Sequence, residues 1–239
     1  MLGAREVAVY FARPEALAGA DRRAAALASL TADERARLER FRFERDRDVA
    51  LASRALQRLA LSRCAPVEPT AWRFATTTHG RPEIVAPPHA PGRVIRFNVA
   101  NTLGLVVCAV TIGRDVGVDV ESWRDDAPYD IVDSHFASTE QAALRALPPE
   151  QHARRFTELW TLKEAYIKAR GHGLALPLDR FWFDLAGEAP RLAIDPELAD
   201  DAASWQVALW SPTPRHCAAL CVRRRDEPPL AIEPRWDLD

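Results

Sequence analysis

The sequence predicts an α+β fold in which the chain divides near residue 112 into two similar halves. Each half contains about three segments whose apolar and β-branched composition is typical of short antiparallel strands. Each half also contains a long segment with helical character, which is expected to pack on its small sheet. We therefore predict a pseudo-duplicated chain with halves at 1–112 and 113–225, followed by a poorly ordered tail at 226–239.

The first half is expected to begin with a strand and to continue into its long helix. Glu6–Ala12 reads EVAVYFA, which is apolar and rich in strand-forming residues. Thr31 can cap a helix, and Glu34 three residues later completes a capping box. This helix should run to about Leu61 with a break near Phe43–Arg47. The remaining strands are predicted at 71–77, 93–99 and 103–111. A loop rich in Gly and Pro at 78–92 separates the first of them from the other two.

The second half opens with another strand and carries two helices. The strand is predicted at 116–121, and Ser138 is expected to cap a helix that ends at Arg145. A longer helix should span about Gln151–Arg170, because Gly171 and Gly173 then stop it. The last three predicted strands lie at 180–185, 204–210 and 216–223.

Composition excludes some functions and favours a soluble protein. The chain has 239 residues and a net charge of −2, so it has no overall attraction to nucleic acid or to an anionic membrane. It contains no signal peptide and no long apolar segment, from which a cytoplasmic location is expected. Residues 34–58 are rich in arginine. Two interpretations fit this run: a solvated helix face with ion pairs, or a basic surface that meets phosphates.

Two carboxylates occupy alternate positions of the strand GVDVE at 117–121. Asp119 and Glu121 therefore share one face, while Val118 and Val120 point the opposite way. Neighbouring carboxylates repel each other unless a cation lies between them. The simpler interpretation is that the acidic face meets solvent and the two valines are buried.

A third carboxylate lies in the helical segment that follows. Glu164 and Lys168 are four residues apart and share one helix face, where a surface ion pair is the simplest interpretation. However, Trp160 and Ile167 are among many apolar neighbours, so this helix should be largely buried. A buried glutamate needs a partner or a metal ion, and oxygen ligands suit Mg²⁺. Three acids with a lysine and separate arginines suggest phosphoryl transfer.

These motifs together resemble a known signature. GVDVE at 117–121 followed by WTLKEAYIKARGHGL at 160–174 is similar to the paired signature of the Sfp-type 4′-phosphopantetheinyl transferases. The resemblance also includes GRP at 80–82, FNVANT at 97–102 and RALQRLALS at 54–62. The family fold is a pseudo-twofold pair of α+β subdomains, each with a small antiparallel sheet packed on a long helix. This agrees with the two predicted halves.

The resemblance implies a specific reaction. Such enzymes transfer the 4′-phosphopantetheine of coenzyme A to a serine of an acyl or peptidyl carrier protein and release adenosine 3′,5′-bisphosphate. Asp119, Glu121 and Glu164 match the ligands of Mg²⁺, with Mn²⁺ as an alternative ion. Glu164, Lys168 and Asp119 match catalytic residues. The resemblance further implies that ten residues contact coenzyme A: Arg37, Thr76, His79, Gly80, Arg81, Asn98, Ala100, Asn101, Asp119 and Lys168.

One departure from the family pattern concerns the coenzyme. Where the family has Ser-His, this chain has Ala100–Asn101, and the histidine is the residue that contacts the 3′-phosphate of coenzyme A. Asn101 can donate a hydrogen bond but cannot carry a positive charge. The resemblance also implies a carrier protein as partner and a monomeric enzyme. The alternatives are a Mg²⁺-dependent phosphohydrolase and a non-catalytic relative that binds carrier proteins. Which carrier protein and which pathway the enzyme serves are open on the sequence.

Overall fold

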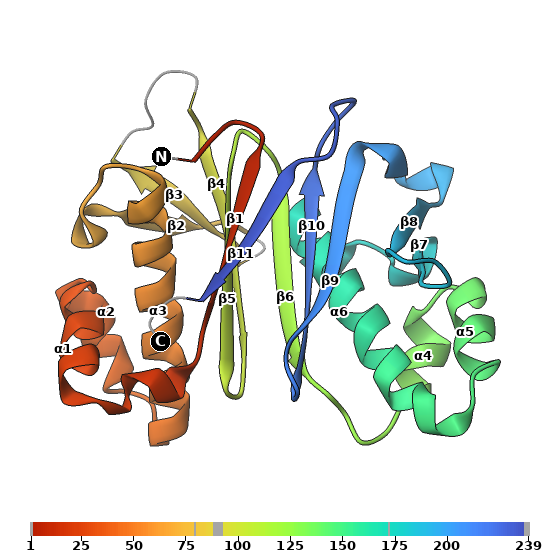
Figure 1. Cartoon of the computed structure of the whole chain (residues 1–239), viewed down its shortest axis with the longest axis horizontal. Helices are drawn as coiled ribbons and strands as arrows, with labels where there is room; N and C mark the ends of the chain where they lie inside the picture. The colour runs from red at the N-terminus through yellow and green to blue at the C-terminus, as the bar shows by residue number, and fades with distance from the viewer. Residues whose placement is uncertain (1, 79, 88–92, 172, 237–239) are drawn as a thin grey trace. The chain divides into compact units, whose positions relative to one another are not determined.

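The computed structural model describes residues 2–78, 80–87, 93–171 and 173–236. The chain divides into two compact units (Figure 1). Unit 1 is Met1–Arg114 together with Leu230–Asp239, and unit 2 is Asp115–Pro229. The boundary therefore lies after residue 114, two residues beyond the predicted one. Each unit combines strands with a long helix, so the predicted α+β class is confirmed, whereas the pseudo-twofold relation stays a prediction.

Unit 1 is built on a four-stranded sheet in the order β11-β1-β5-β4. Its strands are β1 (Glu6–Ala12), β4 (Ile95–Thr102), β5 (Leu105–Ile112) and β11 (Ala231–Trp236). The long helix α3 (Glu44–Cys64) packs on this sheet, because Leu51 and Leu56 share a fully buried apolar core with Tyr10 of β1 and Val106 of β5. The smaller elements are α1 (Ala20–Ala28), α2 (Ala32–Leu38) and the hairpin of β2 (Arg73–Thr76) and β3 (Pro82–Ala86).

Unit 2 is built on a three-stranded antiparallel sheet in the order β6-β10-β9. Its strands are β6 (Val116–Ser122), β9 (Trp205–Thr213) and β10 (His216–Arg223). Helix α6 (His152–Arg170) packs on this sheet and ends at Gly171, which adopts the left-handed conformation with φ of 72°. The remaining elements are α4 (Tyr129–His135), α5 (Ser138–Arg145), β7 (Phe181–Asp184) and β8 (Arg191–Ile194).

Short 3-10 helices connect several of these elements in both units. They lie at Pro14–Ala18, Pro69–Ala71, Pro149–Gln151, Gly173–Ala175, Leu178–Arg180, Pro196–Leu198 and Ala202–Ser204. Within the described residues, no helix is both long and apolar enough to cross a membrane.

The predicted C-terminal tail is wrong. Residues 231–236 form β11, which pairs in parallel with β1 from Glu6 opposite Ala231 to Phe11 opposite Trp236. The physical reason is that β1 is a buried strand whose outer edge would otherwise leave backbone groups unpaired. Pro234 is tolerated in β11 because this strand lies at the edge of the sheet.

Helix starts were predicted with mixed success. Thr31 caps α2: its hydroxyl accepts a hydrogen bond from the Glu34 backbone N–H, and the Glu34 side chain accepts one from the Thr31 backbone. The helix does break, but at 39–43 rather than near Phe43–Arg47, and α3 continues to Cys64, three residues beyond the predicted end. Ser138 is not a cap, because it is already the first residue of α5. The start of α5 is instead held by Glu140, which accepts a hydrogen bond from the N–H of Ala137 at 3.0 Å.

Candidate active site

The close approach of α6 to β6 depends on Gly117. A Cβ atom at this position would lie 2.1 Å from the carbonyl oxygen of Ala165 and 2.2 Å from the backbone nitrogen of Ala169. Such distances are far inside van der Waals contact, so only glycine lets the helix backbone rest on the strand here. The glycine of GVDVE thus brings the predicted acids of the strand to the predicted acid and lysine of the helix.

Asp119 and Lys168 form an ion pair across this contact. The Lys168 Nζ lies 2.5 Å from Asp119 Oδ1. Asp119 is buried, with 4% of its surface exposed, and its second oxygen, Oδ2, has no hydrogen-bond partner among the described residues. Ala219 lies opposite Asp119 on β10, and its small side chain does not supply one. The carboxylate therefore keeps one buried oxygen available to a ligand.

The other two predicted acids interact electrostatically with Asp119. Burial raises the pKa of Glu121 to about 7; the nearby charge of Asp119 adds to this shift, Lys168 opposes it and Glu164 adds further. Burial also raises the pKa of Glu164, with Lys168 opposing and Asp119 adding. The pKa of Asp119 itself is raised by burial, against the effect of Lys168. Each carboxylate is thus held in a site that disfavours its charge.

The interpretation of β6 as a strand with one solvent face is wrong. Val118 and Val120 are buried as predicted, yet Asp119 is buried as well, and Glu121 is half-buried. The reason is that α6 covers the face that carries the acids. Lys168 pairs with Asp119 on the neighbouring strand, and its charge also acts on Glu164, whose pKa it lowers against the effect of burial.

The donor set of this site fits a hard divalent cation, although it is not assembled around one. Among the described residues, no three His, Cys, Asp or Glu side chains lie in an arrangement ready to hold a metal ion. Three features nevertheless fit Mg²⁺. All the donors are carboxylate oxygens, Asp119 Oδ2 lacks a hydrogen-bond partner among the described residues, and the pKa values of Glu121 and Glu164 are raised by burial and further by neighbouring carboxylate charge, which a cation would offset. That Asp119, Glu121 and Glu164 hold the ion stays a prediction, which the chemistry of these donors fits.

Lys163, which the sequence argument missed, fixes α6 beside this site. Its ammonium is fully buried, lies 2.7 Å from Glu140 Oε2, and donates to the carbonyl oxygens of Leu178 and Phe181. Glu140 also accepts a hydrogen bond from the N–H of Phe183. The signal available in the sequence was a lysine in a helix that is apolar nearly all round, since such a charge must have a partner.

A second missed cluster holds the C-terminal end of α6. Asp200 accepts hydrogen bonds from Tyr166 at 2.7 Å, from Arg170 at 2.7 Å and from the indole of Trp205 at 2.9 Å, and it also pairs with Arg223. Although burial opposes its ionisation, these donors hold the pKa of Asp200 below its usual value. The last turn of α6, which carries Lys168, is thereby tied to the loop before β9.

Four of the predicted coenzyme-binding residues of unit 1 line three cavities that share a lining residue. Arg37 and Thr76 line one of about 390 Å³, Asn101 lines one of about 510 Å³, and Arg81 lines one of about 200 Å³. Pro82 lines all three, so the cavities meet at the start of β3.

The stretch at 98–101 does not lie on a single face of β4. Asn98 and Ala100 are buried, with 5% of each exposed, whereas Asn101 is exposed. Because side chains alternate along a strand, Val99 and Asn101 share the cavity side and the other two point to the opposite face of the sheet. The coenzyme contacts predicted for Asn98 and Ala100 stay predictions.

The GRP segment continues a tight turn. Gly80 has φ of 80°, and its N–H donates to the Thr77 carbonyl, while the Thr77 hydroxyl accepts from the Arg81 N–H at 3.1 Å. Glycine suits this turn because side chains disfavour a positive φ. His79 lies outside the described residues.

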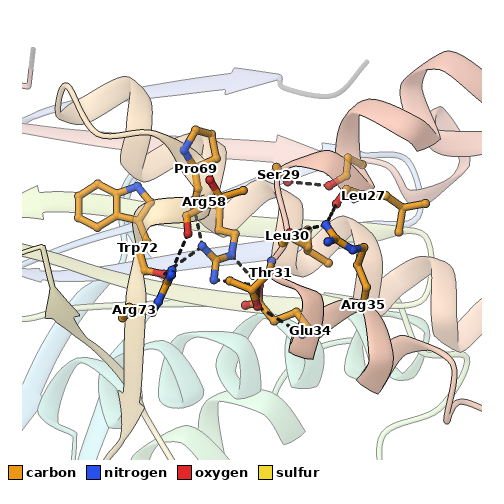
Figure 2. Close-up of polar contacts among 12 residues, drawn as sticks. Leu27, Ser29, Leu30, Thr31, Glu34, Arg35, Arg58, Pro69, Trp72 and Arg73 are labelled. Carbon is orange, nitrogen blue, oxygen red and sulfur yellow. Dashed lines mark hydrogen bonds and ion pairs between the residues drawn. The ribbon is translucent and has the colours of Figure 1, made fainter.

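The arginine-rich segment separates into structural and available side chains. Figure 2 shows Arg58, which is 2% exposed, donating to Glu34 at 2.8 Å and to the carbonyl oxygens of Pro69 and Trp72. Burial opposes the charge of Glu34, but hydrogen bonds from Arg58 and Thr31 hold its pKa below the usual value. Arg37 is different: it is exposed, and no described residue hydrogen-bonds to or pairs with its guanidinium. Arg58 thus fits neither interpretation, because it is buried, and phosphate contact by the exposed Arg37 stays a prediction.

Comparisons with known proteins agree with this division of the chain. A family model described as the 4′-phosphopantetheinyl transferase superfamily matches residues 115–221, and a model of the N-terminal part of 4′-phosphopantetheinyl transferases matches residues 20–112. A 4′-phosphopantetheinyl transferase of Bacillus subtilis is 32% identical over 173 residues, which cover 72% of this chain and 73% of the relative. The 4′-phosphopantetheinyl transferase HetI of Nostoc sp. is 36% identical over 62% of each chain.

Two further similarities complete the comparison. The 4′-phosphopantetheinyl transferase Sfp of Bacillus subtilis strain 168 is 28% identical over 83% of this chain and 84% of its own. Among solved structures, the holo-[acyl-carrier-protein] synthase of Thermotoga maritima aligns with a TM-score of 0.39 and 21% identity, over 47% of this chain and 64% of that chain.

Proposed function

The chain belongs to the 4′-phosphopantetheinyl transferase superfamily, and on this premise we propose that it transfers 4′-phosphopantetheine from coenzyme A to a serine of a carrier protein with the help of Mg²⁺. The serine oxygen forms a bond to the phosphorus next to pantetheine, the bond to the bridging oxygen breaks, and adenosine 3′,5′-bisphosphate leaves. The observation that carries the proposal is the junction of β6 and α6, where Asp119 pairs with Lys168 beside two further acids.

Each residue at the junction has a role that its surroundings support. Glu164 accepts the proton of the serine hydroxyl, directly or through water, because a carboxylate with a raised pKa is a stronger base near neutral pH. Lys168 is partly exposed and steadies the charge that develops on the transferred phosphate. Asp119, Glu121 and Glu164 would hold Mg²⁺, which supplies neutralising charge for the pyrophosphate of the coenzyme.

Residues of unit 1 are proposed to contact the phosphates and the nucleotide of coenzyme A. Arg37 supports this role because its guanidinium is exposed and free of partners among the described residues. Arg81 and Thr76 line cavities that meet at Pro82. Since one chain carries both sets of residues, we expect a monomer to be active; size-exclusion chromatography with light scattering during turnover would test this.

The reaction is tested by intact-protein mass spectrometry of carrier proteins incubated with the enzyme, coenzyme A and MgCl₂. A modified carrier gains about 340 Da, the mass of the phosphopantetheine group. We expect the gain with MgCl₂ and its loss when EDTA is present, with adenosine 3′,5′-bisphosphate released in equal amount. No gain across fatty-acid, polyketide and peptide carriers would contradict the transferase proposal. A gain that persists in EDTA would contradict the metal requirement alone.

A further inference from the structure

Two cavities of unit 1 share the side chain of Arg54. The first, called here the apolar cavity, has a volume of about 510 Å³ and lies between one face of α3 and the end of β4. The second, called the arginine cavity, has a volume of about 390 Å³ and lies between α2, α3 and β2. Arg54 and Pro82 line both. Arg54 can therefore meet a ligand in either cavity.

The apolar cavity has the chemistry of a nucleobase site. Val49 and Ala50 of α3 face Val99 of β4 across it, and the exposed side chains of Phe41 and Leu103 add further apolar surface. Such walls suit a flat heteroaromatic ring, which gains by burial and stacking. The acidic residue at this cavity, Asp46, lies 3.5 Å from the Arg45 guanidinium.

Asn101 brings no positive charge to the apolar cavity. It lines the apolar cavity from β4, and its amide can donate a hydrogen bond but cannot pair with a phosphate dianion as a cation would. Any charge that balances a phosphate here must come from another residue lining the same cavity. Of the residues that line it, Arg54 is the one with a positive charge.

Two of the other arginines that line the arginine cavity are engaged by the protein, and the third, Arg37, does not line the apolar cavity that holds Asn101. Arg58 is buried against Glu34 and two carbonyl oxygens, and Arg73 donates to the carbonyl oxygens of Thr70 and Trp72. Arg54 is exposed, and within the described part of the chain no group hydrogen-bonds to it or forms an ion pair with it. Its planar guanidinium can therefore form a two-pronged contact with a phosphate.

We propose that Arg54 recognises the 3′-phosphate of coenzyme A and supplies the charge that Asn101 lacks. This inference rests on the proposed function for the identity of the ligand, and it makes Arg54 the residue that distinguishes coenzyme A from its 3′-dephospho form. The adenine ring would occupy the apolar cavity, with its 3′-phosphate against Arg54.

The first test measures binding without turnover. Isothermal titration calorimetry compares adenosine 3′,5′-bisphosphate with adenosine 5′-monophosphate, for the wild type, Arg54→Ala and Arg22→Ala. Arg22 is the matched control because it is an exposed arginine in α1 that lines neither cavity. We expect Arg54→Ala to weaken the bisphosphate roughly 10- to 100-fold, the effect of one charged hydrogen-bonding contact, while binding of the monophosphate and the behaviour of Arg22→Ala stay unchanged.

The second test asks whether a cation at position 101 can replace the one lost at position 54. Adding Asn101→His to Arg54→Ala places a titratable cation where the chain has none, so it should restore part of the bisphosphate affinity below about pH 6.5, where histidine is charged. In the transferase assay, Arg54→Ala should raise KM for coenzyme A with little change in kcat, and leave 3′-dephospho-coenzyme A unaffected.

The outcomes separate this inference from the proposed function. A wild type that binds the two nucleotides equally, or an Arg54→Ala variant that weakens both to the same extent, would overturn the role of Arg54. Loss of the bisphosphate preference in Arg54→Ala would support it even if no carrier protein were modified, in which case only the transferase proposal would fail. If carrier proteins were modified normally and Arg54→Ala still preferred the bisphosphate as the wild type does, the transferase proposal would stand and the role of Arg54 would be overturned.

Discussion

Helix α6 carries two lysine–carboxylate pairs five residues apart, and they differ in how completely the protein satisfies them. The ammonium of Lys163 is fully buried and has three oxygen partners, while both oxygens of Glu140 accept backbone hydrogen bonds. Lys168 has 30% of its side chain exposed, and its partner Asp119 keeps one buried oxygen without a hydrogen bond. The difference indicates that the first pair holds the fold and the second is kept available to a ligand.

Removing the lysine of the complete pair should give the largest effect. Lys163→Met leaves Glu140 buried without its counter-charge, so we expect the free energy of unfolding to fall by about 3–5 kcal/mol. Urea denaturation would measure this, and the double variant Lys163→Met with Glu140→Gln should recover part of the loss. If Lys163→Met costs less than about 1 kcal/mol, the pair does not hold the fold.

Neutralising the incomplete pair should mainly affect chemistry. Asp119→Asn removes a buried charge whose second oxygen has no hydrogen bond, and it leaves Lys168 partly exposed to water. We expect the rate of carrier modification to fall roughly 100- to 1,000-fold, as is typical when a group that stabilises charge is lost, with a change in unfolding free energy below about 1 kcal/mol. If Asp119→Asn lowered the free energy of unfolding as much as Lys163→Met, the two pairs would not differ in their contribution to stability.

A smaller effect is expected where the helix rests on the strand. Gly117→Ala forces a Cβ atom against the backbone of α6, so it should destabilise unit 2 by about 1–3 kcal/mol and shift Lys168 relative to Asp119. Gly19→Ala is the control, because no atom lies within 4 Å of the added group and the residue has an ordinary φ of −72°. Equal melting temperatures for the two variants would show that the close approach is not required.

The last prediction concerns the pH dependence of stability. Burial raises the pKa of Glu121 from 4.5 to about 7. The charges of Asp119 and Glu164 add to this shift, and the charge of Lys168 opposes it. The folded chain thus holds this proton at a higher pH than the unfolded chain. Without divalent metal, this group contributes stability that is full below about pH 4.5 and is lost as the pH rises through 7. Glu121→Gln should reduce the change in unfolding free energy between pH 4.5 and 7, measured by urea denaturation. If the dependence of unfolding free energy on pH is unchanged, Glu121 is not the group responsible for it.

Local signals in the sequence predicted those elements that depend on neighbouring residues. The strand at Glu6–Ala12 and the helix capped by Thr31 follow from composition and from contacts within four residues. Helix α6 was predicted to begin one residue early and to end at Arg170, as found, because glycine follows. The signature acids Asp119 and Glu121 were correctly placed on one face, but the helix that covers this face could not be inferred from the strand alone.

The features that were missed depend on residues far apart in the chain. Lys163 meets a glutamate 23 residues earlier in sequence, and Arg58 meets Glu34 on the preceding helix. Strand β11 is short and contains a proline, so its sequence favours a loop; it is the open edge of β1, more than 200 residues away, that makes it a strand. Such partners are set by the tertiary fold rather than by local propensity.

The pairing of β11 with β1 bears on the order in which the enzyme matures on the ribosome. Most of unit 1 precedes unit 2 in the chain, yet its edge strand β11 follows unit 2. Until residues 231–236 leave the exit tunnel, the outer edge of β1 stays open to pairing with other chains. Vectorial synthesis therefore makes all of unit 2 before it makes the strand that closes the sheet of unit 1.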